Sequence, residues 1–183
     1  MAVRDERGFS LAETLVVTAI MVVALGIATS LFVQGNNAYA AQRDHDDARN
    51  NAAAALDMTV RLLRSATTIT VDPDGNNAAD SIRIVGDWNP RDGDTNDAYE
   101  DVTLTVTGGT LFKREPADAA PVAFAERIGS MTFTYWNSTG GAIATPWTAP
   151  QNTLAFVNVA VQSTPINGLT IAVSSAASIR GRE

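Results

Sequence analysis

Residues 7–33 read RGFSLAETLVVTAIMVVALGIATSLFV, and this stretch decides the architecture of the chain. Its last twenty residues, 14–33, contain no charged side chain. At about 1.5 Å of rise per residue, a helix of that length spans about 30 Å, which is the hydrocarbon thickness of a bilayer. Because a helix satisfies its own backbone hydrogen bonds in lipid, we expect the segment to insert into a membrane.

The boundary between the polar leader and the apolar run carries two unusual features. The leader, residues 1–8, is short, and its two arginines are offset by two acids. Gly8 stands directly before the first apolar residue, Phe9, and Glu13 lies inside the apolar stretch. A carboxylate at membrane depth costs roughly 2–3 kcal/mol or more, so it usually has a partner and a purpose.

The run of residues 7–17 resembles the class III signal of type IV prepilins and type II secretion pseudopilins. The resemblance implies that a prepilin peptidase cuts after Gly8 and methylates Phe9, the new N-terminal residue. It also implies that Glu13 becomes the fifth residue of the mature chain. The acids in the leader dilute the positive charge that is usual in this signal.

The spacing of Phe9 and Glu13 suggests how the mature subunit assembles. Cleavage frees an α-amine on Phe9 that is charged near neutral pH. Glu13 lies four residues further along, roughly 6 Å up the helix axis, so it can meet the amine of a neighbour displaced by a similar distance. An unpaired buried charge is costly, and this pair therefore penalises a wrong axial register. The alternative is a glutamate that simply sits near the headgroups, where the helix dipole favours it.

An ordinary secretory signal peptide is a competing interpretation of the same region. The residues Ala38, Tyr39 and Ala40 before Ala41 have the small-x-small form of a signal-peptidase site. Against it, the apolar run is longer than a usual hydrophobic region of about 7–15 residues, and it contains Glu13.

The rest of the chain predicts an α+β fold of the pilin type. Residues 34–66 place small and apolar side chains at spacings of three and four, which predicts an amphipathic continuation of the membrane helix to about residue 65. Residues 67–183 read as a globular domain built on an antiparallel sheet. The expected strands are 67–71, 81–87, 102–106, 110–114, 131–136, 154–162 and 169–175, and Gly108-Gly109 forms a hairpin turn.

This second part is similar to the PilW and pseudopilin J type of minor pilin. The resemblance rests on the end of the helix, the Gly-Gly hairpin, the strand at 131–136 and the C-terminal run at 174–180. It implies a structural subunit of a tip or priming complex, without catalysis of its own. The implied partners are the prepilin peptidase, other major and minor pilins or pseudopilins, the inner-membrane assembly platform and, before assembly, membrane lipid.

The same resemblance implies a location in the bacterial inner membrane, with the N-terminus cytoplasmic and the globular domain outside the cytoplasm. The chain would then pass into a pilus or pseudopilus. A binding alternative makes the globular domain a tip adhesin or a DNA-capturing pilin. The net charge of -7 and the single lysine, Lys113, argue against nucleic acid, because phosphate binding needs a basic face.

Two acidic loops are candidate calcium sites, since calcium prefers carboxylate and carbonyl oxygens. The candidate ligands of the second loop are Asp92, Asp94, Asn96, Asp97 and Glu100. The first loop offers Asp72, Asp74, Asn76 and Asp80. Neither loop completes the EF-hand pattern, because the sixth position lacks glycine and the twelfth lacks glutamate. Solvated turns are the alternative, and we expect no other cofactor.

Overall fold

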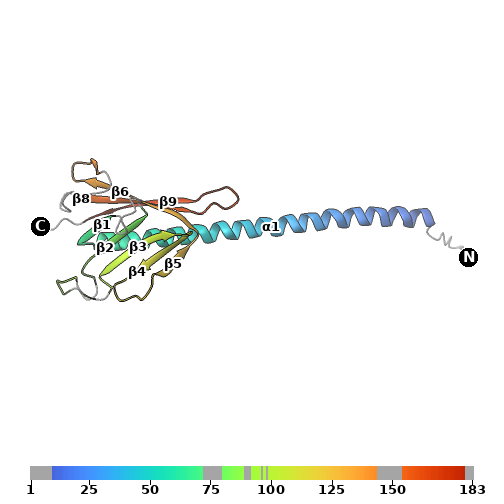
Figure 1. Cartoon of the computed structure of the whole chain (residues 1–183). Helices are drawn as coiled ribbons and strands as arrows, with labels where there is room; N and C mark the ends of the chain where they lie inside the picture. The colour runs from blue at the N-terminus through green and yellow to red at the C-terminus, as the bar shows by residue number, and fades with distance from the viewer. Residues whose placement is uncertain are drawn as a thin grey trace, which may run out of the picture. The chain divides into compact units, whose positions relative to one another are not determined.

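The computed structural model of the chain describes residues 10–71, 80–88, 92–95, 97, 99–143 and 154–179. One helix, α1, is followed by the strands β1 to β9 (Figure 1). The chain divides into two compact units, Met1–Arg43 and Asp44–Glu183. The predicted α+β class, with a long N-terminal helix and antiparallel sheets, is confirmed.

Helix α1 covers Leu11–Arg64, and the sequence pattern placed its end near residue 65. The last turn tightens, because the amides of Ser65 and Ala66 bond to carbonyls three residues earlier. Arg61 and Arg64 lie in this turn, where cations interact favourably with the helix dipole. Within the second unit, one stripe of α1 is buried at spacings of three and four, consisting of Ala48, Ala52, Ala55, Thr59 and Leu63.

The first sheet contains five antiparallel strands in sequence order. They are β1 (Thr68–Val71), β2 (Ser81–Val85), β3 (Asp101–Thr107), β4 (Thr110–Arg114) and β5 (Val122–Glu126). The predicted hairpin turn joins β3 and β4, and Gly108 and Gly109 have φ angles of 59° and 82°. Positive φ at both central residues is the requirement of the turn that best matches the strand twist.

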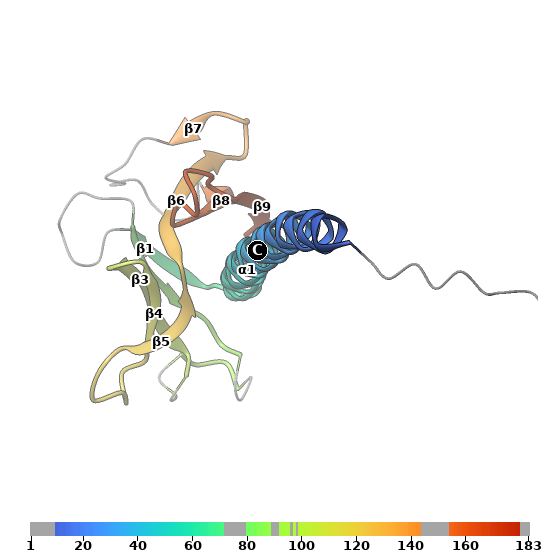
Figure 2. The same ribbon diagram turned by 90° about the vertical axis from the view of Figure 1, so that its right-hand side faces the viewer.

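The second sheet was not predicted as a separate layer, because the strand pattern of residues 67–183 indicates only one antiparallel sheet. Its strands are β6 (Ile128–Asn137), β7 (Ala142–Ile143), β8 (Leu154–Ser163) and β9 (Ala172–Ser178), in the order β7-β6-β8-β9 (Figure 2). The last strand begins at Ala172 rather than at the predicted Leu169. Asn167 and Gly168 adopt positive φ there, and a bridge between Ile166 and Leu169 closes a turn.

The chain changes sheets at Arg127, between β5 and β6, where φ is 61°. Two hydrogen bonds hold this corner: Ile128 N donates to Gly109 O (2.9 Å), and Thr164 N donates to Arg127 O (2.8 Å). The Arg127 guanidinium pairs with Asp44 Oδ1 of α1 at 2.9 Å. Because the corner is a single residue inside an otherwise continuous extended pattern, hydrophobic alternation alone does not mark it.

The core of the second unit lies between α1 and the inward faces of both sheets. One buried cluster joins the α1 stripe to strand residues that alternate with outward-facing ones. Among the fully buried side chains are Leu63, Ile82, Ile84, Leu104, Leu111, Tyr135, Val157, Val159 and Val161. The small residues of the stripe let the helix backbone approach the sheets closely.

A pair of matched substitutions tests this packing. Ala52 is fully buried and the adjacent Ala53 is exposed. Ala52→Leu should destabilise the fold by about 1–3 kcal/mol, because added methylenes overpack a filled core. Ala53→Leu should leave stability nearly unchanged, since leucine is also a good helix former. Thermal unfolding of the full chain in neutral detergent, followed by circular dichroism, compares the two. Equal melting temperatures would contradict the packing described here.

Candidate functional site

The cleavage and methylation residues, Gly8 and Phe9, lie outside the described residues, so their prediction stays a prediction. The described chain begins at Ser10, and α1 begins at the next residue. Glu13 therefore lies in the first turn of α1.

Ser10 and Glu13 form a reciprocal pair of hydrogen bonds at the start of α1. Glu13 N donates to Ser10 Oγ (3.2 Å), and Ser10 N donates to Glu13 Oε2 (3.0 Å). This is a capping box, which satisfies two backbone amides that a helix start otherwise leaves without partners. This box was not predicted, although its Ser-x-x-Glu signature is present at residues 10–13.

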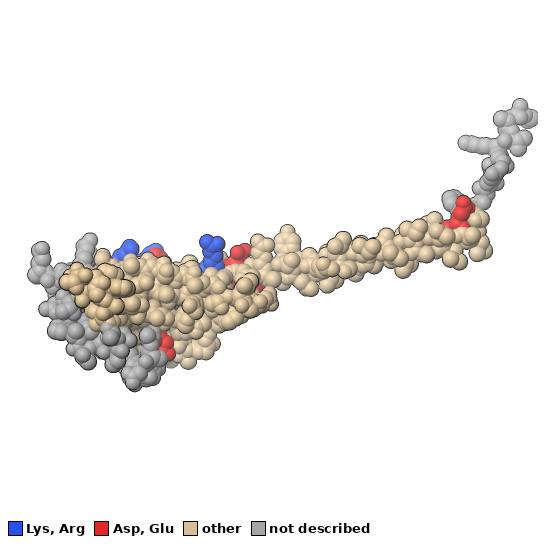
Figure 3. Space-filling view, turned by 90° about the horizontal axis from the view of Figure 1, so that it is seen from above, with Lys and Arg blue, Asp and Glu red and all other residues tan. Residues whose placement is uncertain are grey.

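The apolar part of α1 exposes its large side chains all along its length. Leu11, Ile20 and Phe32 are 82, 63 and 69 % exposed, and nothing in the described chain covers this part. Figure 3 shows it in tan, with a red acidic group at its start. By length and composition α1 can cross a membrane. Each buried large apolar side chain gains about 1.5–3 kcal/mol over exposure to water, so this surface needs lipid or protein partners.

Threonine hydroxyls in the apolar part of α1 are satisfied inside the helix. Thr14 Oγ1 donates to Leu11 O (2.9 Å), Thr18 Oγ1 donates to Thr14 O (2.9 Å), and Thr29 Oγ1 donates to Leu25 O (2.8 Å). Such back-bonding removes a polar cost that an apolar environment would otherwise impose. The surface of this segment is therefore compatible with lipid or with packed helices.

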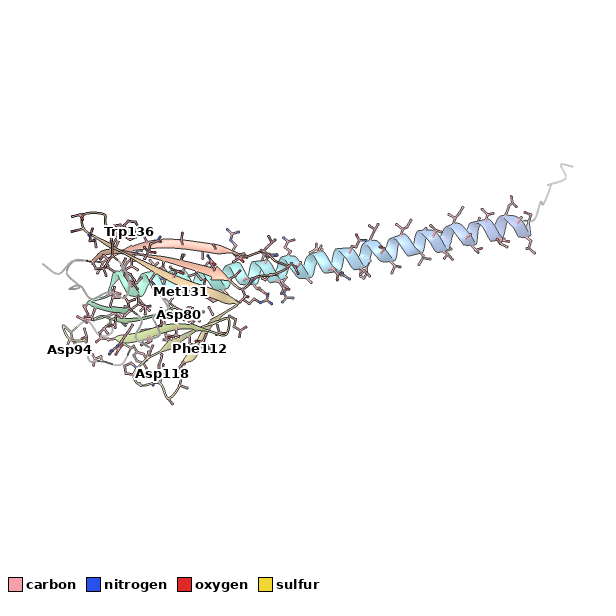
Figure 4. The ribbon with its side chains drawn as sticks, turned by 45° about the horizontal axis from the view of Figure 1, so that its top comes forward. Asp80, Asp94, Phe112, Asp118, Met131 and Trp136 are labelled. Atoms are coloured by element: carbon pink, nitrogen blue, oxygen red, sulfur yellow. The ribbon has the colours of Figure 1, made fainter. Side chains whose placement is uncertain are left out.

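The second acidic loop brings three of its predicted ligands together. The carboxylates of Asp92, Asp94 and Asp97 lie within 4.8 Å of one another, at the end of the first sheet where Figure 4 labels Asp94. Asn96 falls outside the described residues. Of the first loop, only Asp80 is described.

Glu100 does not join the three clustered carboxylates. Its side chain is fully buried, and it accepts hydrogen bonds from Trp88 N (3.0 Å) and Asp97 N (3.4 Å). Asp87 Oδ2 accepts a hydrogen bond from Gly93 N of the loop (3.1 Å). Glu100 therefore positions the loop backbone, and the loop gathers negative charge in a small volume.

This crowding changes the titration of Asp97. The pKa of Asp97 is raised above its ordinary value, mainly by partial burial and secondly by the negative charges of Asp92 and Asp94. A carboxyl group whose pKa is raised by folding favours the folded state when it is protonated. Its contribution to the free energy of unfolding is lost as the pH rises through the pKa of the folded state. At neutral pH the ionised Asp97 therefore disfavours the fold.

Asp97→Asn should consequently raise the melting temperature at pH 7 in a buffer containing a chelator. The gain should disappear at pH 3, below the ordinary aspartate pKa of about 3.9, because both side chains are then neutral. Melting curves of the two chains at both pH values measure the effect. A lower melting temperature for Asp97→Asn at pH 7 would show that the loop needs the charge.

Calcium binding to this loop remains a prediction, and the same variant tests it. If Asp92, Asp94 and Asp97 take the ion, added calcium should raise the melting temperature of the natural chain, because an ion that binds only the folded state stabilises it. Asp97→Asn should lose most of that rise. An isothermal titration without heat, together with an unchanged melting temperature, would leave the solvated-turn interpretation.

The structure also bears on the DNA-capturing alternative. Arg83 is paired with Asp101, and Lys113 is paired with Glu115. These two cations therefore lie beside carboxylates, which weakens their attraction for phosphate.

Comparison with known proteins adds one finding to this geometry. Residues 3–29 match the family model described as the prokaryotic N-terminal methylation motif. No curated protein matches the chain. The matched range includes Gly8, Phe9, the capping box and most of the apolar part of α1. The chain thus carries a prepilin-type N-terminus. This motif supports the interpretation that the protein is similar to type IV pilins and pseudopilins.

Proposed function

We propose that this chain is a minor pilin or pseudopilin. It is cut between Gly8 and Phe9 by a prepilin peptidase, methylated on Phe9, and assembled through its N-terminal helix into a type IV pilus or a type II secretion pseudopilus. The observation that carries the proposal is the methylation motif at residues 3–29, which overlaps an apolar helix that the described residues leave exposed.

The two halves of α1 suit two different surroundings. Before assembly, lipid covers the apolar half, and the globular domain lies outside the cytoplasm. In the filament, the corresponding helices of other pilins or pseudopilins take the place of lipid around the same side chains. The second half is held in its own core by the buried stripe that includes Ala48 and Leu63.

Glu13 has two roles in this proposal. Within its own chain it completes the capping box with Ser10. One carboxylate oxygen accepts the Ser10 amide, and a carboxylate has further lone pairs for a second donor. We infer that the ammonium group of Phe9 in an adjacent subunit is that donor. The pair fixes the axial register, because displacement would leave two charges unpaired in an apolar setting.

The proposal places the subunit at the tip or in the priming complex, in accordance with the resemblance to the PilW and pseudopilin J type. Its partners are then other minor subunits and the inner-membrane assembly platform. The alternative function is a tip adhesin that uses the same stem. A secreted domain cut before Ala41 is the less favoured alternative, because that cut would fall inside α1.

Two substitutions of Glu13 separate capping from register. Glutamine at this position still completes a capping box but carries no charge. Valine can neither complete the box nor supply a charge. If the charge sets the register, both Glu13→Gln and Glu13→Val should reduce incorporation into filaments by about tenfold or more, because the partner ammonium is left unpaired. The subunit content of sheared filaments, measured by immunoblot against the membrane fraction, gives the ratio.

Removal of the leader should be normal in both variants, which is the control for processing. If Glu13→Gln assembles like the natural chain and only Glu13→Val fails, Glu13 acts as a cap and the register role is wrong. If both variants assemble normally, neither role matters for assembly.

A further inference from the structure

The outward face of the first sheet holds a groove that the stem does not use. The groove has a volume of about 690 Å³ and is lined by strands β2, β3 and β4 and by the segment that follows β4. Strand register places Arg83, Thr103 and Arg114 in one row across these three strands. Phe112 lies opposite Thr105 in the next row, and Pro116 and Pro121 also line the groove. Figure 4 labels Phe112 on the first sheet and Trp136 on the second sheet.

The charges in the groove leave one cation available. Arg83 donates to both carboxylate oxygens of Asp101, at 2.8 and 2.5 Å. Glu115 is nearly buried and is paired with Lys113. Arg114 is exposed, and among the described residues its guanidinium has no ion pair. In a chain with a net charge of -7, the groove thus presents a single unpaired positive charge.

The remaining polar groups of the groove are hydroxyls. Thr103, Thr105 and Thr107 alternate along the outward face of β3, and all three line the groove. None of these hydroxyls forms a hydrogen bond within the described part of the chain. β3 is paired with β2 on one side and β4 on the other, so its backbone cannot accept an added peptide strand. A ligand must therefore be recognised through side chains: hydroxyls, one aromatic ring and one guanidinium.

We propose that this groove binds a saccharide that carries an isolated carboxylate, such as a uronic acid unit within a neutral glycan. The Arg114 guanidinium matches a carboxylate with two parallel N–H donors. The threonine hydroxyls exchange hydrogen bonds with sugar hydroxyls, and the Phe112 ring supplies the apolar surface typical of small-ligand sites. A densely charged polyanion is disfavoured, because the acidic chain repels it at long range.

This proposal deepens the adhesin alternative and is independent of the stem. A subunit that fails to bind sugar can still be processed and assembled, and a subunit that fails to assemble can still bind sugar. The sugar-binding measurements and the assembly measurements therefore test the two proposals independently.

The test uses the full chain in neutral detergent and two disaccharides that differ by one group. Cellobiouronic acid and cellobiose share their rings and ring hydroxyls, but the first has a carboxylate where the second has a hydroxymethyl group. The acid should bind about tenfold more tightly, which is the usual effect of a hydrogen bond to a charged group. Saturation-transfer NMR and calorimetric titration at low salt give the two affinities.

Matched variants assign the binding to the groove. Arg114→Gln should reduce the affinity for cellobiouronic acid to that for cellobiose, with no change in the melting temperature. Phe112→Leu should weaken both disaccharides. Arg49→Gln removes another exposed arginine, which lies on α1, and should change neither affinity.

Three results would overturn the proposal. The first is that neither disaccharide binds at millimolar concentration. The second is that both bind equally, or that Arg114→Gln and Arg49→Gln weaken the acid alike, which would indicate only general attraction. The third is that an acetylated tripeptide with a free C-terminal carboxylate binds more tightly than the disaccharide, which would make the ligand a peptide.

Discussion

The structure depends on an apolar helical surface that no other described part of the chain covers. Along the first unit the large side chains of α1 point outward on all sides, whereas from Ala48 onward one face of the same helix is closed into a core. Exposed apolar area on this scale is unfavourable in water. The first half of α1 therefore requires lipid or other helices, and the second half provides the globular part with its central element.

Glu13 is the one charge that this apolar surface must accommodate, and its position limits what it can do. As the third helical residue it lies where the helix dipole favours an anion and where the Ser10 amide needs an acceptor. These local contacts make the carboxylate tolerable in a single subunit. A second contact, with the ammonium group of a neighbouring subunit, would make the same side chain fix the axial register of the filament.

Sequence patterns predicted the class of fold because they report local periodicity. The run at residues 14–33 and the alternation at 102–106 both appear as the expected elements, α1 and β3. The division into two sheets was missed, because it depends on the left-handed backbone of Arg127 and on contacts with Gly109 and Thr164 that are distant in sequence. The groove was missed for the same reason, since it requires the register of three strands. The sequence identified the acidic residues of the second loop, but only the folded backbone shows that three of their carboxylates lie close together.

Assembly through α1 requires a mature chain that keeps the apolar helix and loses only the leader. Mass spectrometry of the N-terminal peptide, taken from protein purified from its native membrane, measures this directly. We predict a peptide that begins at Phe9 and carries one additional methyl group on its α-amine. A peptide that begins at Met1, or a chain that begins at Ala41 without the apolar helix, would contradict it.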